Sequence, residues 1–404
     1  MLAVVLAAGE GTRMRPLTHK VPKVMLPVEG KPVLEHIIRA CLEAEIKQFI
    51  IVTGYHEEII KSYFGDGHHY NAQIRYVSQN QPLGTAHAIA QARDFIEQKF
   101  LVLNGDSLVS SSTVKALAYK LMDKTIVVAV KEVVKPQCYG VIEVRGDEVV
   151  RIIEKPKEPL TNLANLGIYG FDPVIFNAID MTVLSSRGEY EITDSIQLLI
   201  DQSYDVGYFN VRNMWIDIGT PWDLLSANEI LLKGISTEID GTVEPFATIV
   251  GDVKIGEGSI IRNGSYIVGP VVIGEYCDIG PNCYLRPSTS IGHRVKVGNA
   301  VEVKNSIIMD DTKIGHLSYV GDSVIGHRCN FGAGTLIANL RLDEKNIKVG
   351  GLDTGRRKLG VVMGDDVHTG INSMINVGTM IGPDSKLGMG ALADGIYPPK
   401  SRIR

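Results

Sequence analysis

The sequence has little of what marks exported, membrane-bound or nucleic-acid-binding proteins. Its five cysteines are an odd number without a CxxC pair, which argues against a disulfide framework and against a zinc site. No apolar run approaches the roughly 20 residues that a membrane span needs. Met1 leads directly into an apolar segment without a basic n-region, so export is not expected. The net charge of −5 gives no bulk reason to expect nucleic acid. These absences predict a cytoplasmic protein without a membrane anchor.

The length of 404 residues predicts two domains. In residues 1–235 short apolar runs alternate with helical patterns, which predicts an α/β domain with a mostly parallel, Rossmann-like sheet. Strands are expected at residues 4–6, 49–52 and 100–103, and helices at residues 34–44 and 85–96. Ligands of such sheets bind beyond the carboxyl ends of the strands, which makes residues 7–13 and 104–106 candidate site loops.

A different pattern occupies residues 240–404, where an aliphatic side chain recurs every sixth residue. This period is typical of an all-β, left-handed parallel β-helix of hexapeptide repeats, whose stacked coils bury the aliphatic residues. After a one-residue slip the period resumes at Tyr319, and the segment 340–358 breaks it and is expected to loop out. The positions before the slip are Val243, Ile249, Ile255, Ile261, Ile267, Ile273, Ile279, Leu285, Ile291, Val297, Val303 and Met309.

A glycine-rich turn follows the first strand. Glycines allow backbone amides to approach a phosphate closely, and Arg13 and Lys23 supply the positive charge that a triphosphate requires. The run from Leu6 to Met14, followed by Pro22 and Lys23, resembles the signature of sugar-1-phosphate nucleotidyltransferases. The resemblance implies that Ala8, Gly9 and Gly11 belong to the nucleotide-binding loop and that Arg13 and Lys23 are catalytic.

Further motifs of that family follow in its order and cover nearly the whole first half. The resemblance implies nucleotide contacts from the segment that contains Gln79, Gly84 and Thr85, with Gln79 facing the pyrimidine edge. It implies sugar contacts at four positions, namely Gly140, Glu154, Lys155 and Asn165.

Two aspartates complete this constellation. Asp106 resembles the family's metal-binding position, and Asp217, in the run WIDIGT, supplies the second carboxylate. Mg²⁺ is a hard ion that prefers one or two carboxylates together with phosphate oxygens. In the reaction a sugar-phosphate oxygen attacks the α-phosphorus and pyrophosphate leaves, so catalysis consists mainly of positioning and charge neutralisation.

The second half resembles the acetyltransferase domain of bifunctional enzymes of UDP-N-acetylglucosamine synthesis. The runs GHLSYVGD, from Gly315, and NFGAGT, from Asn330, carry the resemblance. Acetyl transfer to an amine needs a base near pKa 7, which suits His316. The other implied contacts are Arg286 and Lys304 with the sugar phosphate, Tyr319 and Asn330 with the sugar ring, and Ala333 and Asn339 with acetyl-CoA.

Two departures leave alternatives open. The segment 340–358 replaces a shorter loop of the bacterial enzymes, in which a lysine reaches the substrate. Arg356, Arg357 and Lys358 are all candidates to take the place of that lysine. The WIDIGT run resembles glucose-1-phosphate thymidylyltransferases, so UTP and dTTP both remain candidate substrates. An archaeal-type bifunctional enzyme combines these features. The alternatives are a thymidylyl- or uridylyltransferase with a structural β-helix, and a non-catalytic scaffold. The family resemblance implies a homotrimer that binds sugar phosphates.

Overall fold

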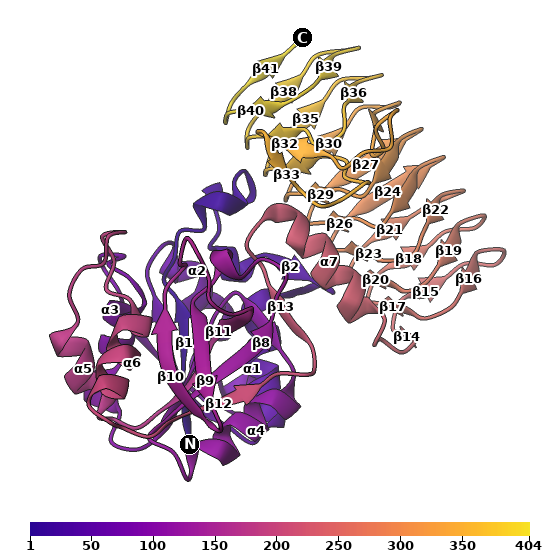
Figure 1. The fold of residues 1–404 in the computed structure, drawn as a ribbon. Coiled ribbons are helices and arrows are strands. Elements are labelled where there is room, and N and C mark those ends of the chain that lie inside the picture. Colours follow the sequence, from indigo (N-terminus) through magenta and orange to yellow (C-terminus); the bar gives the residue numbers. More distant parts are fainter. The chain divides into compact units, whose positions relative to one another are not determined.

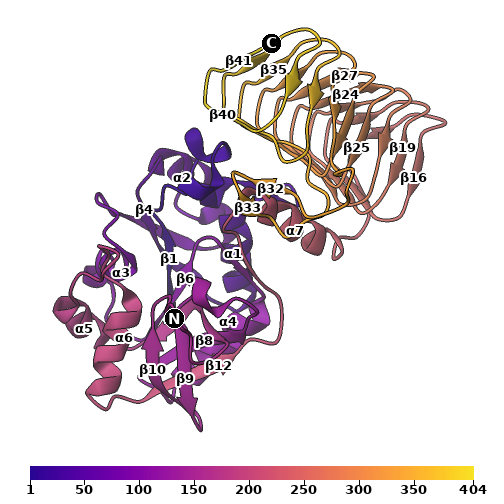
Figure 2. The same cartoon turned by 45° about the horizontal axis from the view of Figure 1, so that its top comes forward.

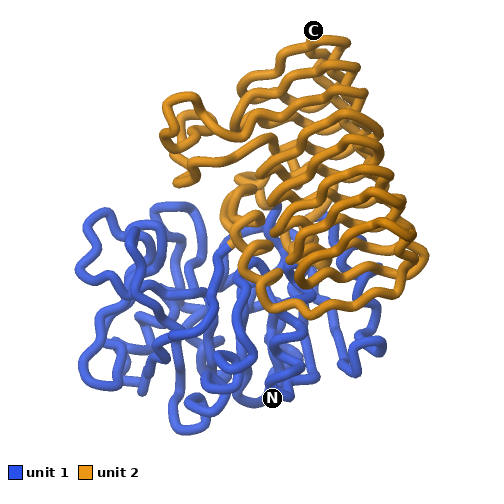
Figure 3. Tube along the Cα trace, turned by 90° about the vertical axis from the view of Figure 1, so that its right-hand side faces the viewer, with its two compact units in different colours: residues 1–10, 33–217 blue, residues 11–32, 218–404 orange.

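A computed structural model describes all 404 residues and divides into two compact units. Residues 1–10 and 33–217 form unit 1, and residues 11–32 and 218–404 form unit 2 (Figure 3). The domain boundaries at residues 235 and 240 stay a prediction. The contacts place residues 11–32 and helix α7 (Pro221–Leu232) in the unit that contains the β-helix. No helix combines the length and the apolar character needed to cross a membrane.

Unit 1 is built on a nine-stranded sheet with the strand order β5-β4-β1-β6-β11-β8-β12-β10-β9 (Figure 1). Neighbours among β5, β4, β1 and β6 are parallel, whereas β11 runs antiparallel to both of its neighbours. The strands are β1 (Leu2–Ala7), β4 (Gln48–Thr53), β5 (Gln73–Ser78), β6 (Phe100–Asn104), β8 (Ile126–Glu132), β9 (Val141–Arg145), β10 (Glu148–Ile153), β11 (Leu163–Phe171) and β12 (Val206–Asn210).

Two groups of helices accompany this sheet (Figures 1 and 2). Helices α3, α5 and α6 pack together, and α1 packs on α4. Because helices cover both faces, the central strands are apolar along their whole length, as in the buried run of β4 from Phe49 to Val52. The α/β prediction is confirmed, but the sheet is mixed rather than mostly parallel, because β11 and β10 run antiparallel to their neighbours. The helices are α1 (Val33–Glu43), α2 (Glu57–Phe64), α3 (Thr85–Ala90), α4 (Ser111–Leu121), α5 (Ile175–Met181) and α6 (Ile192–Asp201).

Helix α3 is shorter than the pattern over residues 85–96 predicts. It ends at Ala90, and residues Arg93–Phe95 form a 3-10 turn. Arg93 explains the break, since its Nη2 donates to Asp180 Oδ1 at 2.6 Å and to the Phe176 carbonyl oxygen at 2.9 Å. These bonds hold the turn against α5, so tertiary contacts override the helical pattern.

Residues 238–403 form three parallel sheets, the arrangement of the predicted β-helix, and Figure 2 shows the coils stacked on one another. The first sheet contains β14 (Glu238–Ile239), β17 (Val253–Ile255), β20 (Val271–Ile273), β23 (Thr289–Ile291), β26 (Ile307–Ile308), β29 (Val324–Ile325), β34 (Val362–Met363), β37 (Met380–Ile381) and β40 (Ile396–Tyr397). The second contains β15 (Thr242–Val243), β18 (Ile260–Ile261), β21 (Asp278–Ile279), β24 (Lys296–Asn299), β27 (Lys313–His316), β30 (Asn330–Phe331), β35 (His368–Thr369), β38 (Lys386–Leu387) and β41 (Arg402–Ile403). The third contains β16 (Thr248–Val250), β19 (Tyr266–Val268), β22 (Tyr284–Leu285), β25 (Glu302–Lys304), β28 (Tyr319–Gly321), β31 (Leu336–Ile337), β36 (Met374–Ile375) and β39 (Leu392–Ala393).

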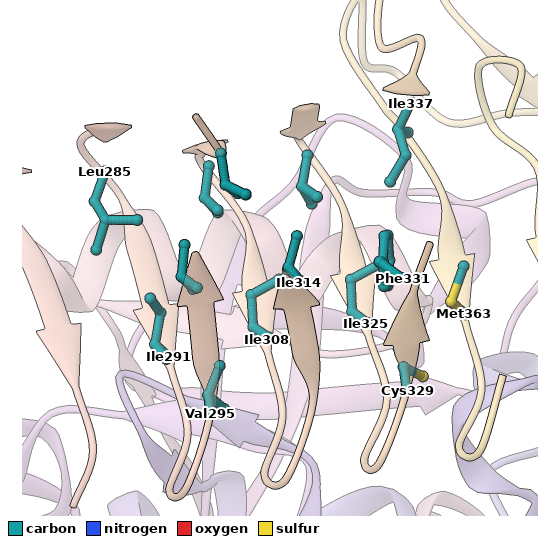
Figure 4. Packing of buried hydrophobic residues seen from close by; sticks show 14 of the residues in the cluster. Leu285, Ile291, Val295, Ile308, Ile314, Ile325, Cys329, Phe331, Ile337 and Met363 are labelled. Carbon is teal, nitrogen blue, oxygen red and sulfur yellow. The ribbon is translucent and has the colours of Figure 1, made fainter. Parts of the chain in front are cut away.

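The core of the β-helix is a column of aliphatic side chains that point inward from the coils (Figure 4). Ile273 aligns with Ile291, eighteen residues later, whereas Ile291 aligns with Ile308, only seventeen later. The inward positions are therefore Ile308 and Val320. The predicted inward positions Met309 and Tyr319 are wrong, because coils shortened by one residue move the period back by one.

Segment 340–358 leaves the coil between β31 and β34. Val324 in β29 pairs directly with Val362 in β34, so the coils on either side of the segment remain stacked. Leu340 and Lys358 form an antiparallel bridge at its base, and β32 (Lys348–Val349) and β33 (Leu352–Asp353) form a hairpin within it. The excursion therefore has its own hydrogen-bonded structure.

Candidate active sites

The predicted nucleotide-binding loop begins where β1 ends. The Ala8 carbonyl oxygen accepts a hydrogen bond from the Tyr55 amide at 3.3 Å, and a Cβ placed on Gly9 would meet nothing within 4 Å. Gly11 has a φ of +67°, and a Cβ there would lie 2.7 Å from the Cβ of Lys23. Glycine is therefore needed at position 11 both for its backbone conformation and for the close approach of Lys23.

Arg13 and Lys23 lie on short 3-10 turns of unit 2. Arg13 belongs to the turn Thr12–Met14 and is exposed, whereas Lys23 opens the turn Lys23–Met25 and is 8% exposed. Thr18 ties the segment together, because its hydroxyl donates to the Gly11 carbonyl oxygen at 2.8 Å. The structure thus brings Gly11 and Lys23 into contact, as the motif order implies.

The structure brings the two predicted metal ligands together in unit 1. Asp106 directly precedes β7 (Ser107–Val109), and Asp217 ends β13 (Trp215–Asp217). These strands pair antiparallel with Asp217 opposite Ser107, so the two aspartates stand at neighbouring positions. The Gly105 amide donates to the Leu6 carbonyl oxygen at 2.8 Å, which ties the Asp106 loop to the end of β1. A pair of hard carboxylates suits Mg²⁺, which takes its other ligands from phosphate and water.

The predicted base-recognition segment packs against the chain before α6. The Gly84 backbone has a φ of +112° and lies against the Tyr190 backbone. The Tyr190 amide donates to the Leu83 carbonyl oxygen at 2.8 Å, and the Ile192 amide donates to Thr85 Oγ1 at 3.0 Å. Gly84 and Thr85 therefore hold this segment in place.

Gln79 is nearly buried, with 7% exposure. Its Nε2 donates to the Gly84 carbonyl oxygen at 3.1 Å and lies 2.9 Å from His87 Nδ1. These contacts fix the orientation of the Gln79 side chain. Its predicted contact with the pyrimidine edge stays a prediction.

The four predicted sugar-binding residues lie close together. The backbone N–H of Asn165 donates to the Gly140 carbonyl oxygen at 2.8 Å, and a Cβ on Gly140 would lie 3.0 Å from Glu154 Oε2. Lys155 is the next residue, and its Nζ lies 3.6 Å from Glu154 Oε1. A side chain at position 140 would therefore press on Glu154 and Asn165, two of the residues predicted to bind the sugar.

Residues of the segment 187–194, which the motifs did not single out, also contribute to this cluster. Arg187 Nη1 lies 3.1 Å from Glu154 Oε1 and 3.3 Å from Glu191 Oε1. Burial raises the pKa of Glu191 and also that of Asp194. The polar residues Glu191, Thr193 and Asp194 at the start of α6 were the available signal.

In the β-helix, the predicted sugar-phosphate residues occupy neighbouring coils of the third sheet. Arg286 follows β22 and donates to Glu302 Oε1 at 2.8 Å, and this bond raises the pKa of Arg286. Lys304 Nζ lies 3.2 Å from Asp322 Oδ2 and belongs to the coil that stacks between those of Arg286 and Asp322. Each predicted cation is therefore already paired with a carboxylate.

Asp322 is the central acceptor of this cluster, and the motifs did not assign it a role. Its side chain is almost fully buried and accepts from Lys304, from Asn305 Nδ2 at 2.7 Å and from Asn339 Nδ2 at 2.6 Å. Asn339 also donates to the Tyr319 hydroxyl at 3.1 Å. Asp322 thus orients three side chains from the two coils on either side of its own, and two of these side chains were predicted to contact substrates.

His316 stands at the corner where β27 turns into β28. Its ring is exposed, and its backbone carbonyl oxygen accepts from Ser318 Oγ at 2.8 Å and from the Gly334 amide at 3.3 Å. Ala333 occupies the same corner one coil later, directly before Gly334. Asn330 lies beside Lys313 of the same sheet. The predicted base His316 and the predicted acyl-donor contact Ala333 therefore share one corner, whereas Asn330 lies at the other end of the strand, level with Lys313.

The candidate substrate cations of the excursion line one pocket of about 500 Å³, together with Leu340 and Glu344. Arg356 donates to Ser226 Oγ at 2.8 Å, and Arg357 pairs with Glu344. Lys358 lies at the base of the excursion, where it pairs with Leu340, the residue that follows Asn339. The choice among the three cations stays a prediction.

Comparisons with known proteins agree with both halves of the motif pattern. The nucleotidyl transferase family model matches residues 2–234, and the model of the GMPPB C-terminal domain matches residues 267–390. A protein of Methanocaldococcus jannaschii named bifunctional protein GlmU is 43% identical over 400 residues, which cover 98% of this chain and 95% of the relative. A bifunctional sugar-1-phosphate nucleotidylyltransferase/acetyltransferase of Sulfurisphaera tokodaii is 39% identical over 406 residues, which cover 98% of this chain and 97% of the relative.

A solved structure supports the fold of the first half. A putative glucose-1-phosphate thymidylyltransferase of Bacillus anthracis superposes with a TM-score of 0.54 at 28% identity. The match covers 59% of this chain and 98% of that protein. The remainder of this chain is therefore additional to the thymidylyltransferase architecture.

Proposed function

The chain belongs to the nucleotidyl transferase family and is similar along 98% of its length to a protein named bifunctional GlmU. On this premise we propose that it catalyses two successive reactions. It transfers an acetyl group from acetyl-CoA to glucosamine 1-phosphate, and it then joins the N-acetylglucosamine 1-phosphate to a uridylyl group. The observation that carries the proposal is the presence of two separate constellations, the aspartate pair of unit 1 and the Asp322 cluster of the β-helix.

In the nucleotidyl step, a phosphate oxygen of the sugar 1-phosphate attacks the α-phosphorus of UTP. The bond between the α-phosphorus and the bridging oxygen breaks, and pyrophosphate leaves. Arg13 holds the β- and γ-phosphates, and Lys23 bridges the reacting phosphates. Asp106 and Asp217 would hold Mg²⁺, which would neutralise part of the phosphate charge. Gln79 faces the base, and Gly140, Glu154, Lys155 and Asn165 bind the sugar.

In the acetyl step, the neutral amine of glucosamine 1-phosphate attacks the thioester carbonyl, the carbon–sulfur bond breaks and CoA leaves. His316 accepts the proton that the amine loses. Arg286 and Lys304 bind the phosphate, and Asp322 keeps Lys304 and Asn339 in position. Tyr319 and Asn330 contact the sugar ring, while Ala333 and Asn339 contact acetyl-CoA.

We propose a homotrimer, supported by an outward-facing column of apolar residues on the third sheet of the β-helix. Tyr266, Tyr284, Leu336, Met374 and Leu392 are each more than a third exposed and follow one another along the strand register. Glu302 and Tyr319 stand within the same column. Association through this sheet in a closed ring places the acetyl site beside a neighbouring subunit.

The cysteines support a reducing compartment, and we propose the cytoplasm. All five are free, and four of them are buried. Burial raises the pKa of Cys277 to about 11, which keeps this thiol protonated and unreactive. A disulfide plays no part in the fold.

Product analysis tests the proposed function. Purified protein is incubated with glucosamine 1-phosphate, N-acetylglucosamine 1-phosphate or glucose 1-phosphate, with UTP or dTTP, each with and without acetyl-CoA. We expect CoA release only with glucosamine 1-phosphate, and pyrophosphate release with its acetylated product. Pyrophosphate release without acetyl transfer to any amino sugar would instead support the thymidylyl- or uridylyltransferase with a structural β-helix. Uracil and thymine differ by one methyl group, worth about 1–3 kcal/mol in a pocket. UTP and dTTP differ in addition by the 2′-hydroxyl of the ribose, so both nucleotides are assayed.

A further inference from the structure

Residues 11–32 carry both Arg13 and Lys23, yet they pack in the same compact unit as the β-helix (Figure 3). We propose that Lys20 and Asn228 are positioning residues for nucleotidyl transfer: they fasten this segment to the β-helix at two points and thereby hold Arg13 and Lys23 in a reactive conformation. The inference rests on the proposed nucleotidyl transfer. It makes the β-helix a required part of that reaction, in addition to its acetyl site.

The first fastening point is Lys20. Its Nζ lies 2.8 Å from Asp366 Oδ2 and 3.1 Å from Asp384 Oδ1. These carboxylates stand on turns of successive coils, since the Asp384 amide donates to the Asp365 carbonyl oxygen. Arg328 fixes Asp366 by two further bonds of 2.8 Å each. A lysine held by two oriented carboxylates within a network contributes more than an isolated surface pair.

Backbone packing lies close to the same point. A Cβ placed on Gly364 would lie 3.2 Å from the Pro16 carbonyl oxygen, so the segment touches the β34 coil directly. The Lys20 ion pairs therefore lie beside a backbone contact that leaves little room for a side chain at position 364. Because Gly364 directly precedes Asp365 and Asp366, the backbone and charge contacts reinforce each other.

The second fastening point is Asn228 of α7, whose side chain is fully buried. Its Oδ1 accepts from the Glu29 amide at 2.8 Å and from Ser290 Oγ at 2.6 Å. Its Nδ2 donates to the Ser288 carbonyl oxygen at 3.0 Å. One side chain thus joins the hairpin of β2 (Pro27–Val28) and β3 (Lys31–Pro32) to a coil of the β-helix, and a buried amide loses substantial free energy if it loses these partners.

Lys23 lies between the two fastening points along the chain and is nearly buried. Its Cβ abuts Gly11, and Thr18 binds the Gly11 carbonyl oxygen, so the segment is closely packed within itself. A shift of the backbone at Lys20 therefore also displaces Lys23 and the turn that carries Arg13, because no flexible loop separates them. Misplacement of a reacting group by about 1 Å can cost 10²-fold in rate.

The test compares Lys20→Ala, Lys20→Arg and Lys20→Glu in the whole chain. Lys386→Ala is the control, because Lys386 is an exposed lysine in strand β38, which begins two residues after Asp384. We expect kcat for pyrophosphate release to fall about ten- to hundred-fold in Lys20→Ala and further in Lys20→Glu. Lys20→Arg retains most of the activity. CoA release and the activity of Lys386→Ala stay at the wild-type level.

A reciprocal exchange separates positioning from a general loss of folding. Lys20→Glu combined with Asp384→Lys restores an ion pair between the same positions, and we expect it to recover part of the lost kcat. An unchanged kcat in Lys20→Ala overturns the proposal, and so does a loss confined to KM for UTP. If both activities fall in Lys20→Ala and the reciprocal exchange restores neither, the proposal is also overturned. A wild-type protein without pyrophosphate release contradicts the proposed function itself.

Discussion

Several side chains act through partners that the linear sequence does not reveal. The acetyltransferase motif predicts Lys304 and Asn339, but it is Asp322 that holds both of them. Asp322 lies inside the recognised run, yet its partners come from coils before and after its own. Sequence reasoning finds residues that meet a substrate by type and spacing, and it misses an acceptor whose role depends on stacking.

The contribution of Asp366 to stability can be tested by its dependence on pH. Hydrogen bonds from Arg328, and secondarily from Lys20, lower its pKa to about 2, and Asp365 and Asp384 are the other carboxylates that face these cations. A carboxylate with a lowered folded-state pKa contributes stability that is present above its unfolded pKa, about 3.9, and is lost as the pH falls through the folded value.

We therefore expect wild-type protein to exceed Asp366→Asn in unfolding free energy at neutral pH, and we expect the difference to shrink between about pH 4 and pH 2. Urea unfolding at a series of pH values measures this difference. A difference that stays the same from pH 7 to pH 2 would show that the charge of Asp366 is not its source.

At the scale of elements, local patterns predicted three strands of the unit 1 sheet, β1, β4 and β6, and the hexapeptide period of the β-helix. They did not predict where the period shifts. At each shift the inward residue stands next to another hydrophobic or aromatic residue, Ile308 beside Met309 and Val320 beside Tyr319. Both neighbours in each pair are hydrophobic or aromatic, so the sequence fits two registers. The stacking of Ile308 on Ile291 decides between them. The end of α3 was missed for a similar reason, since Arg93 is held by α5.

The outward column of the third sheet predicts the oligomeric state. We expect the wild-type protein to scatter light as three chains of 44.1 kDa each. Met374→Glu places a charge in the middle of the apolar column and should shift the protein toward monomers, because burying an unpaired carboxylate is costly. Val134→Glu is the matched control, because Val134 is an almost fully exposed apolar residue of unit 1. A wild-type monomer, or trimers that survive Met374→Glu unchanged, would contradict this assembly.

At the scale of the whole molecule, the sequence predicted two reactions and the residue types for each. It did not predict that residues 11–32 pack with the β-helix, since Lys20 and Asp366 lie 346 positions apart and neither belongs to a motif. The motif assigns Arg13 and Lys23 to nucleotidyl transfer, and the contacts assign their support to the other half of the chain. Truncation after about residue 240 therefore removes more than the acetyl site.

The central claim is that one chain carries two chemically independent sites, and a pair of reciprocal variants tests it most directly. His316→Ala and Asp106→Ala are assayed for CoA release from acetyl-CoA with glucosamine 1-phosphate, and for pyrophosphate release from UTP with N-acetylglucosamine 1-phosphate. Loss of the base in His316→Ala should slow CoA release by about 10²–10⁴-fold and leave pyrophosphate release near the wild-type rate. Asp106→Ala should show the opposite pattern. A His316→Ala protein that acetylates normally, or a single variant that abolishes both activities while remaining folded, would contradict the account.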